Sequence, residues 1–66
     1  MTIKITGWIA TDKNNHCYLY EEMPLRSSEF GVWIGIKKAL FETGTFPFLT
    51  WENSPKEVSV VINVME

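Results

Sequence analysis

The chain has a single cysteine, Cys17, in only 66 residues, and this restricts how a fold can be held together. One cysteine cannot form an internal disulfide, and no set of cysteine and histidine residues has the spacing of a zinc site. A domain this small lies near the lower size at which an unassisted hydrophobic core outweighs the chain entropy lost on folding. The core must therefore come from large side chains. The sequence predicts one domain, residues 1–66, with a thin margin of stability.

Aromatic residues supply that bulk, with three tryptophans, two tyrosines and four phenylalanines in the chain. Each buried aromatic side chain removes roughly 150–250 Å² from water. The densest apolar stretch is FPFLTW, residues 46–51. Phe46 and Phe48 share one strand parity and Trp51 has the other, so a regular strand here would be apolar on both faces. We therefore expect an irregular segment that lies across the sheet, with Trp51 as a plug in the core.

Charge and hydropathy narrow the classes of function. Six basic and eight acidic residues are scattered along the chain and give a net charge of −2. No basic run suited to a phosphate backbone is present, which argues against nucleic acid as the partner. The first ten residues have no basic segment followed by a long apolar run, which argues against a signal peptide or a transmembrane helix. We expect a cytoplasmic protein without membrane association, and a lone free cysteine agrees with a reducing compartment.

Alternating apolar residues predict strands near both ends of the chain, at residues 2–10 and 57–65. Gly7 interrupts the first strand, and a glycine inside a strand indicates a bulge or a close backbone approach. A bulge at Gly7 would reverse which of the following residues point inward, so alternation alone does not show whether Trp8 faces the core or the solvent. The large apolar surface of the indole favours burial of Trp8.

Between these ends the sequence predicts further strands joined by polar turns. Residues 12–16, DKNNH, tolerate left-handed backbone and predict a hairpin loop. The strand that follows, residues 17–22, should end at Pro24, which cannot donate a ladder hydrogen bond. Residues 30–36 are rich in strand formers, whereas residues 37–43 contain good helix formers and allow one short helix. The expected fold is mainly β, as a small antiparallel sheet or a small barrel of four to five strands.

Strand parity and the aromatic segment together define a predicted core. Its members are the large apolar side chains on the inward face of each strand and the rings of residues 46–51. The predicted core residues are Ile3, Ile5, Trp8, Leu19, Val32, Ile34, Phe46, Phe48, Trp51, Val58, Val60 and Ile62.

Three pieces of the chain, GWIATDKN, YLYEEMPLR and FPFLTWENSPKEV, together resemble a family of small uncharacterised proteins of gut bacteria and of their phages and mobile elements. The family pattern reads GWxAxD, then YLYxxxP, then FPxLTWExxPxEV. The resemblance spans most of the chain and is weakest over GIKKALFETG in the middle. It implies a phage or mobile-element origin and implies no activity. The matching positions are Gly7, Trp8, Ala10, Asp12, Tyr18, Tyr20, Pro24, Arg26, Phe46, Pro47, Leu49, Thr50, Trp51, Glu52, Pro55, Glu57 and Val58.

The residues best suited to catalysis do not converge. His16 and Cys17 are adjacent, and adjacent residues on an extended chain point to opposite faces, so the thiolate–imidazole contact cannot form. Glu21 and Glu22 are also neighbours and lack the convergence that paired acid and base chemistry needs. The loop at residues 12–15 lacks the glycine and the bidentate glutamate of a calcium loop. We therefore expect no enzyme activity, no metal and no cofactor.

Two binding functions remain. Tyr18 and Tyr20 share one face of a predicted strand, as in platforms on which single-stranded nucleic acid stacks its bases, with Arg26 as a nearby cation. The alternative is protein recognition, because Tyr, Trp and Arg dominate the energetics of interfaces. The predicted binding residues are Tyr18, Tyr20, Arg26 and Trp33. We expect a non-enzymatic interaction or accessory module that binds an unknown protein or a second copy of itself. Binding of single-stranded nucleic acid is the second hypothesis.

Overall fold

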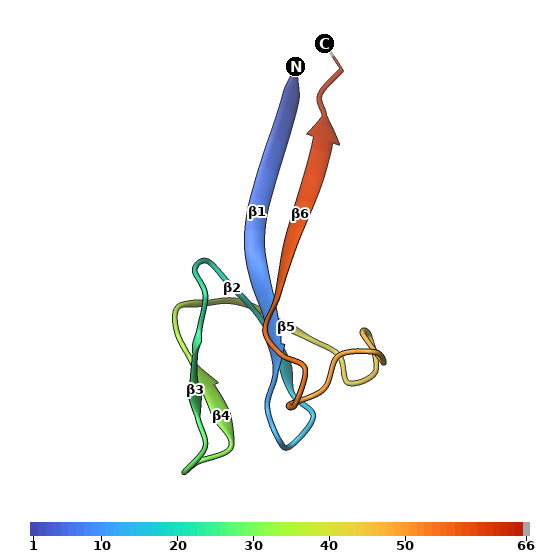
Figure 1. Cartoon of the computed structure of the whole chain (residues 1–66). Helices are drawn as coiled ribbons and strands as arrows, with labels where there is room; N and C mark the ends of the chain where they lie inside the picture. Colours follow the sequence, from blue (N-terminus) through green and yellow to red (C-terminus); the bar gives the residue numbers. More distant parts are fainter. Residues whose placement is uncertain (66) are drawn as a thin grey trace.

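The computed structural model describes residues 1–65, which contain six β-strands and no helix (Figure 1). The prediction of an all-β chain is confirmed. The side chain of Val60, a predicted core residue, lies outside the described part. In chain order the strands are β1 (Thr2–Thr11), β2 (Cys17–Tyr20), β3 (Leu25–Ser27), β4 (Val32–Ile34), β5 (Lys37–Phe41) and β6 (Lys56–Asn63).

Four of the strands form one antiparallel sheet in the order β5-β2-β1-β6, and β3 pairs with β4 in a separate two-stranded sheet. β5 and β6 lie at opposite edges of the larger sheet, so the sheet is open. Of the two predicted architectures, the antiparallel sheet is confirmed and the closed barrel is not formed.

The short helix predicted near residues 37–43 is wrong. Residues Lys37–Phe41 form β5, which pairs with β2 so that Leu40 lies opposite Tyr18 and Ala39 opposite Leu19. A helix of two turns is marginal in water. Strand pairing instead gives the backbone along the outer edge of β2 its hydrogen-bond partners. Tertiary pairing therefore overrides the helical propensity of this segment.

The sheet is covered on both faces where β1 and β2 pair, and each face has its own small core. Neighbouring strand residues point to opposite faces, so Ala10 enters one core and Ile9 enters the other. The tryptophan core consists of Ala10, Tyr20, Trp33 and Trp51, with Trp8 and Tyr18 at its margin. The Ile9 core consists of Ile9, Cys17 and Leu49, with Leu19, Phe41, Phe46 and Val58 at its margin.

Hydrogen bonds to Trp33 fix the β3–β4 hairpin over the tryptophan core. The Trp33 backbone N–H donates to Asp12 Oδ1 (2.9 Å), and its indole Nε1–H donates to the carbonyl of Thr11 (3.0 Å). The Tyr20 hydroxyl donates to the Trp33 carbonyl (3.2 Å). Every polar group of Trp33 is therefore paired, and the residue can be buried without an unsatisfied donor or acceptor.

This hairpin reverses the parity that the sequence predicted for β4. Trp33 faces the core at 4 % exposure, whereas Ile34 is 56 % exposed and lies opposite the exposed Leu25. The assignment of Ile34 to the core is therefore wrong, and Val32 is only partly buried. Burial of the larger indole, with its hydrogen bonds satisfied, outweighs burial of the isoleucine.

Residues 46–54 form irregular turns that carry Trp51 into the tryptophan core. Trp51 is buried, as the sequence predicts, and its ring centroid lies 5.4 Å from that of Trp33. Phe46 is partly buried, but Phe48 is 64 % exposed, so its assignment to the core is wrong. Leu49 takes the inward position instead, because the turn that joins the Leu49 N–H to the Phe46 carbonyl (2.9 Å) breaks the strand alternation.

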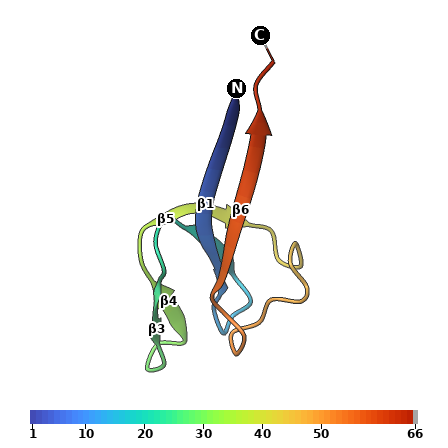
Figure 2. The same cartoon turned by 45° about the horizontal axis from the view of Figure 1, so that its top comes forward.

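The first half of β1 and most of β6 project from the body as a two-stranded ribbon (Figures 1 and 2). The pairing of β1 with β2 begins only at Trp8, opposite Tyr20, whereas the pairing of β1 with β6 starts at Thr2, opposite Asn63. We call residues 2–7 and 58–63 the arm. It makes the molecule elongated, with extents of 48 × 21 × 17 Å, and Met1 and Val64 lie side by side at its tip.

The arm explains the remaining errors in the predicted core. Ile3, Ile5 and Ile62 share one face of the ribbon, as the alternation predicts, but they are 40 %, 51 % and 42 % exposed. Their assignment to the core is wrong because no other segment of the described chain covers this part of the ribbon. The partly buried residues of the predicted core, besides those named above, are Trp8, Leu19 and Val58.

Candidate functional site

The residues predicted to bind a partner do not form one open surface. Tyr20 is fully buried and Trp33 is nearly so, and both belong to the tryptophan core. Tyr18 is partly buried and meets Tyr20 edge to face, with ring centroids 6.4 Å apart. A stacking platform needs two open rings side by side, and here only the ring of Tyr18 is partly open.

Arg26 is exposed, yet its guanidinium is engaged within the protein. Arg26 Nη2 donates to the carbonyl of Trp51 (2.6 Å) and to that of Glu52 (3.3 Å). Its Cζ lies 4.4 Å from the ring centroid of Trp51 and 5.0 Å from that of Trp33, within cation–π range. Arg26 therefore clamps the irregular segment to the β3–β4 hairpin and has a structural role.

Burial raises the pKa of two side chains inside the body, Tyr20 and Cys17. It raises the pKa of the Tyr20 hydroxyl well above the ordinary value, and the nearby Asp12 carboxylate adds to the shift. Burial also raises the pKa of the Cys17 thiol. The nucleophilic form of cysteine is the thiolate, so this environment keeps Cys17 in its unreactive form.

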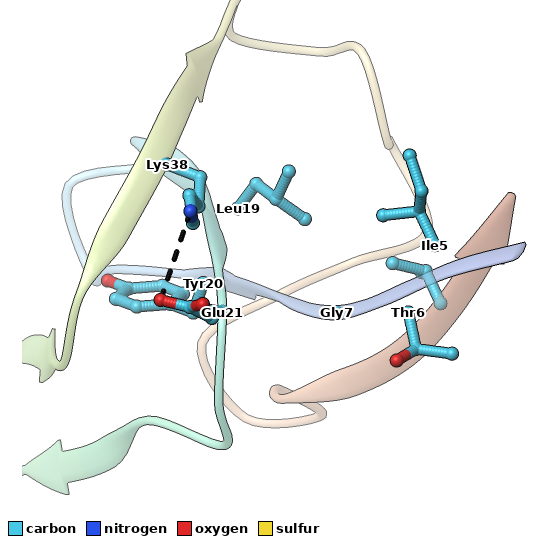
Figure 3. Close-up of a pocket in the computed structure, with 8 residues that line it drawn as sticks. Ile5, Thr6, Gly7, Leu19, Tyr20, Glu21 and Lys38 are labelled. Carbon is cyan, nitrogen blue, oxygen red and sulfur yellow. Dashed lines mark ion pairs between the residues drawn. The ribbon is translucent and has the colours of Figure 1, made fainter. Parts of the chain in front are cut away.

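A pocket with a volume of about 290 Å³ lies at the fork where β2 diverges from β1 (Figure 3). It is walled on one side by β1 and β6 and on the other by β2, the turn after β2, and β5. Ile5 and Gly7 of β1 and Val58 of β6 line it on the first side, and Leu19, Glu21 and Lys38 line it on the second.

The pocket lies beside Gly7, on the face of the sheet that carries Ile5. Leu19 lies opposite Ile9 and Val58 lies opposite Gly7, so both belong to this face. Thr6 is the next residue of β1, and its side chain points to the other side of the strand (Figure 3). The pocket adjoins the edge of β1 from which β2 departs after Tyr20. We call the pocket the edge slot.

Gly7 marks the point at which β2 and β1 part. A Cβ atom on Gly7 would lie 3.0 Å from the Tyr20 carbonyl oxygen and 3.2 Å from Leu19 Cδ1. The pairing of β1 with β6 continues without a shift from Thr6 through Gly7 to Trp8, so the bulge is not formed. Of the two explanations that the sequence offered for this glycine, the close backbone approach is the one observed.

The edge slot combines an apolar floor with a charged rim. Ile5, Leu19 and Val58 contribute apolar lining. Lys38 Nζ lies 3.8 Å from Glu21 Oε2 at the rim, and both side chains are about half exposed (Figure 3). An ion pair this exposed contributes little to stability and can be rearranged at small cost.

The edge of β1 next to the slot has no partner strand. Residues 2–7 pair with β6 on one side, and within the described part of the chain no strand pairs with their other side. The outward backbone N–H and C=O groups of a strand edge remain available for pairing with another chain. The arm therefore presents an open strand edge that leads directly into the edge slot.

Sequence reasoning missed Ile5, Leu19, Glu21 and Lys38 as site residues. The signal that would have found them is a mismatch of lengths within the predicted first hairpin. Strand alternation covers residues 2–10, whereas the strand that returns from the 12–16 loop is cut short by Pro24. A hairpin whose two strands differ in length leaves part of the longer strand without a partner on that side.

No group of three or more His, Cys, Asp or Glu side chains within residues 1–65 could hold a metal ion. That part of the chain also contains no helix long and apolar enough to cross a membrane. Comparisons of the chain with protein-family models, with curated proteins and with solved structures find no match.

Proposed function

We propose that this protein is a non-enzymatic protein-interaction module that binds its partner through the arm. The observation that carries the proposal is the uncovered apolar face of the arm, where Ile3 and Ile5 lie on the same side as Ile62. Ile3 and Ile62 are cross-strand neighbours, so these side chains form one contiguous patch. An isolated two-stranded ribbon is only marginally stable in water, and contiguous exposed apolar patches mark interaction sites.

The opposite face of the arm is mostly polar, so a partner is expected on one side only. Thr2, Lys4 and Thr6 alternate with the isoleucines, and Ser59 and Asn63 face them from β6. The Thr2 hydroxyl lies 3.3 Å from Asn63 Oδ1. This alternation is the pattern of a sheet with one wet face and one covered face.

Binding of single-stranded nucleic acid is the weaker proposal. The ring of Tyr20 is buried, and the Arg26 guanidinium is occupied by backbone carbonyls and tryptophan rings. The net charge of −2 opposes approach to a phosphate backbone at physiological salt. A titration with short oligonucleotides should leave the tyrosine and tryptophan fluorescence unchanged at low and at high salt. Quenching that weakens as salt is added would favour the nucleic-acid hypothesis instead.

Affinity capture with arm variants tests the protein-interaction proposal. The double variant Ile3→Thr/Ile5→Thr removes much of the apolar patch but keeps β-branched residues suited to strands. Leu25→Thr makes a similar change at an exposed position of β3, outside the arm. A protein captured from lysate of the producing cells by the wild type and by Leu25→Thr, but not by the double variant, is the expected result. Capture that survives the double substitution would overturn the proposal.

Light scattering distinguishes a foreign partner from a second copy. A concentration-dependent dimer that becomes a monomer in Ile3→Thr/Ile5→Thr would identify the partner as the protein itself. A wild-type monomer at high concentration would leave a foreign protein as the partner. Both variants should keep the wild-type circular dichroism spectrum, because the substituted side chains are exposed.

A further inference from the structure

We propose that the partner contributes an extended peptide strand, which pairs with the free edge of β1 at residues 2–6 and inserts an apolar side chain into the edge slot. This inference rests on the proposed function and adds the site and the chemistry of the partner. Recognition by strand addition takes its affinity from main-chain hydrogen bonds and its specificity from pockets for alternate side chains. The arm supplies the open edge, and the slot supplies the pocket.

The position of the added strand follows from where β2 ends. Tyr20, the last residue of β2, lies opposite Trp8, and the chain then turns away. The Tyr20 carbonyl oxygen already lies beside Gly7. An added strand would therefore take up the same line from the position opposite Thr6 onward, and the peptide residue before that position would leave the line of β2. All pairs of neighbouring strands in this sheet are antiparallel, so the added strand would run antiparallel to β1, in the direction of β2.

The dimensions of the slot suit side chains of a neighbouring strand. Its volume of about 290 Å³ lies at the lower end of the roughly 300–1,000 Å³ typical of small-molecule pockets. Ile5 borders it on the apolar face of β1, next to the position of the added strand. An apolar side chain on the peptide residue that precedes the position opposite Thr6 would meet Leu19 and Val58, which line the same space.

Charge favours a foreign strand over a second copy of this chain. A two-fold axis at Lys4 would pair residues 2–6 of two copies and set Lys4 opposite Lys4 of the second copy, and like charges in that position are destabilising. An axis at Ile3 would leave the slot empty. An axis at Ile5 would push the second copy against β2, which already occupies the edge at Trp8. A strand that carries an acidic residue opposite Lys4 fits the whole edge and complements its charge.

The register therefore defines a peptide pattern. Read from its N-terminus, the peptide has one residue at the slot and then positions opposite Thr6, Ile5, Lys4 and Ile3 in turn. The residue at the slot should be apolar, and so should the positions opposite Ile5 and Ile3, which share the face of the apolar patch. The position opposite Lys4 should be Asp or Glu. The pattern is apolar, polar, apolar, acidic, apolar.

The capped hexapeptide Leu-Thr-Val-Glu-Val-Thr is the probe for this site. Titrated into ¹⁵N-labelled protein, it should shift the amide resonances of residues 2–6 saturably and slow their hydrogen exchange. Replacement of its leucine by alanine should weaken binding about tenfold, because less apolar area enters the slot. Replacement of its glutamate by lysine should weaken binding roughly fivefold through like-charge contact with Lys4.

A charge exchange at Lys4 provides the decisive control. Lys4 is exposed, so Lys4→Glu should fold normally and should now prefer the peptide with lysine over the peptide with glutamate. Lys56→Glu makes the same charge change on β6 near the body, away from the free edge of β1, and should keep the wild-type preference. A Lys4→Glu protein with unchanged preference would overturn the assigned register and site.

The remaining outcomes separate this inference from the proposed function. Shifts confined to residues 56–63 would place the partner on β6 and overturn the inference. Protection of residues 2–6 that grows with protein concentration alone would assign the edge to a second copy. If the peptides do not bind but capture still depends on Ile3 and Ile5, the inference fails and the proposed function stands. If capture is also independent of Ile3 and Ile5, both fail.

Discussion

Trp51 packs against the ring of Trp33 and beneath the guanidinium of Arg26, and it is 8 % exposed. Trp51→Ala would leave a cavity in the tryptophan core, and large-to-small changes of this kind cost about 3–5 kcal/mol. That loss is comparable with the whole stability expected of a domain this small. We expect Trp51→Ala to lose its cooperative thermal transition, measured by circular dichroism. Phe48→Ala, in the same segment but exposed, should melt close to the wild type, and similar melting of both variants would contradict this role of Trp51.

Tyr20 makes the stability depend on pH in the alkaline range. Because burial raises the pKa of Tyr20, the folded state keeps a proton that the unfolded chain releases above the ordinary value of 10.0. The free energy of unfolding should therefore be unaffected by this group at neutral pH and should fall above pH 10, by about 1.4 kcal/mol per pH unit. Tyr20→Phe should lose this slope, while also losing about 1 kcal/mol with the hydrogen bond to Trp33.

Urea unfolding at about pH 8 and about pH 11 gives the free energy of unfolding at each pH. The decrease between the two pH values is then compared between the wild type and Tyr20→Phe. Cys17 is present in both proteins, so any contribution from its raised pKa cancels in the comparison. Tyr18→Phe, on the same strand but at the margin of the core, serves as the matched control. Equal alkaline slopes in the wild type and Tyr20→Phe would contradict a neutral, buried Tyr20.

At the scale of elements, β5 is the segment that the sequence could not identify. Lysine, alanine and leucine favour a helix, and the partner that overrides them, β2, lies some twenty residues away in the chain. Ala39→Val separates the two structures by the sign of its effect. Valine should stabilise a strand in which residue 39 lies opposite Leu19, by up to about 1 kcal/mol, whereas in a helix it would destabilise. The measurement is the free energy of unfolding in urea, and a decrease relative to the wild type would contradict the strand.

At the scale of the whole molecule, periodicity in the sequence predicts which residues share a face but not which part of that face is covered. Ile5 and Ile9 have the same parity on β1, yet Ile5 is 51 % exposed and Ile9 only 2 %. The difference comes from Leu49, which packs on Ile9 from a distant segment that alternation does not place. The same limit misled the site prediction, because the sequence does not show that Tyr20 and Trp33 meet in one core.

The contrast between body and arm leads to a prediction about local stability. Trp8 and Ile9 of β1 lie between β2 and β6, with a core on each face, whereas residues 2–6 have one neighbouring strand and an uncovered apolar face. Elements with few buried contacts open locally without global unfolding. Backbone amides of β1 that pair with β6 should therefore exchange with solvent at least tenfold faster in residues 2–6 than at Trp8 and Ile9 of the free protein, by NMR. Equal protection in dilute solution would mean that the arm opens only when the whole domain unfolds. The arm would then be stable without a partner, and its exposed isoleucines would no longer indicate that one is needed.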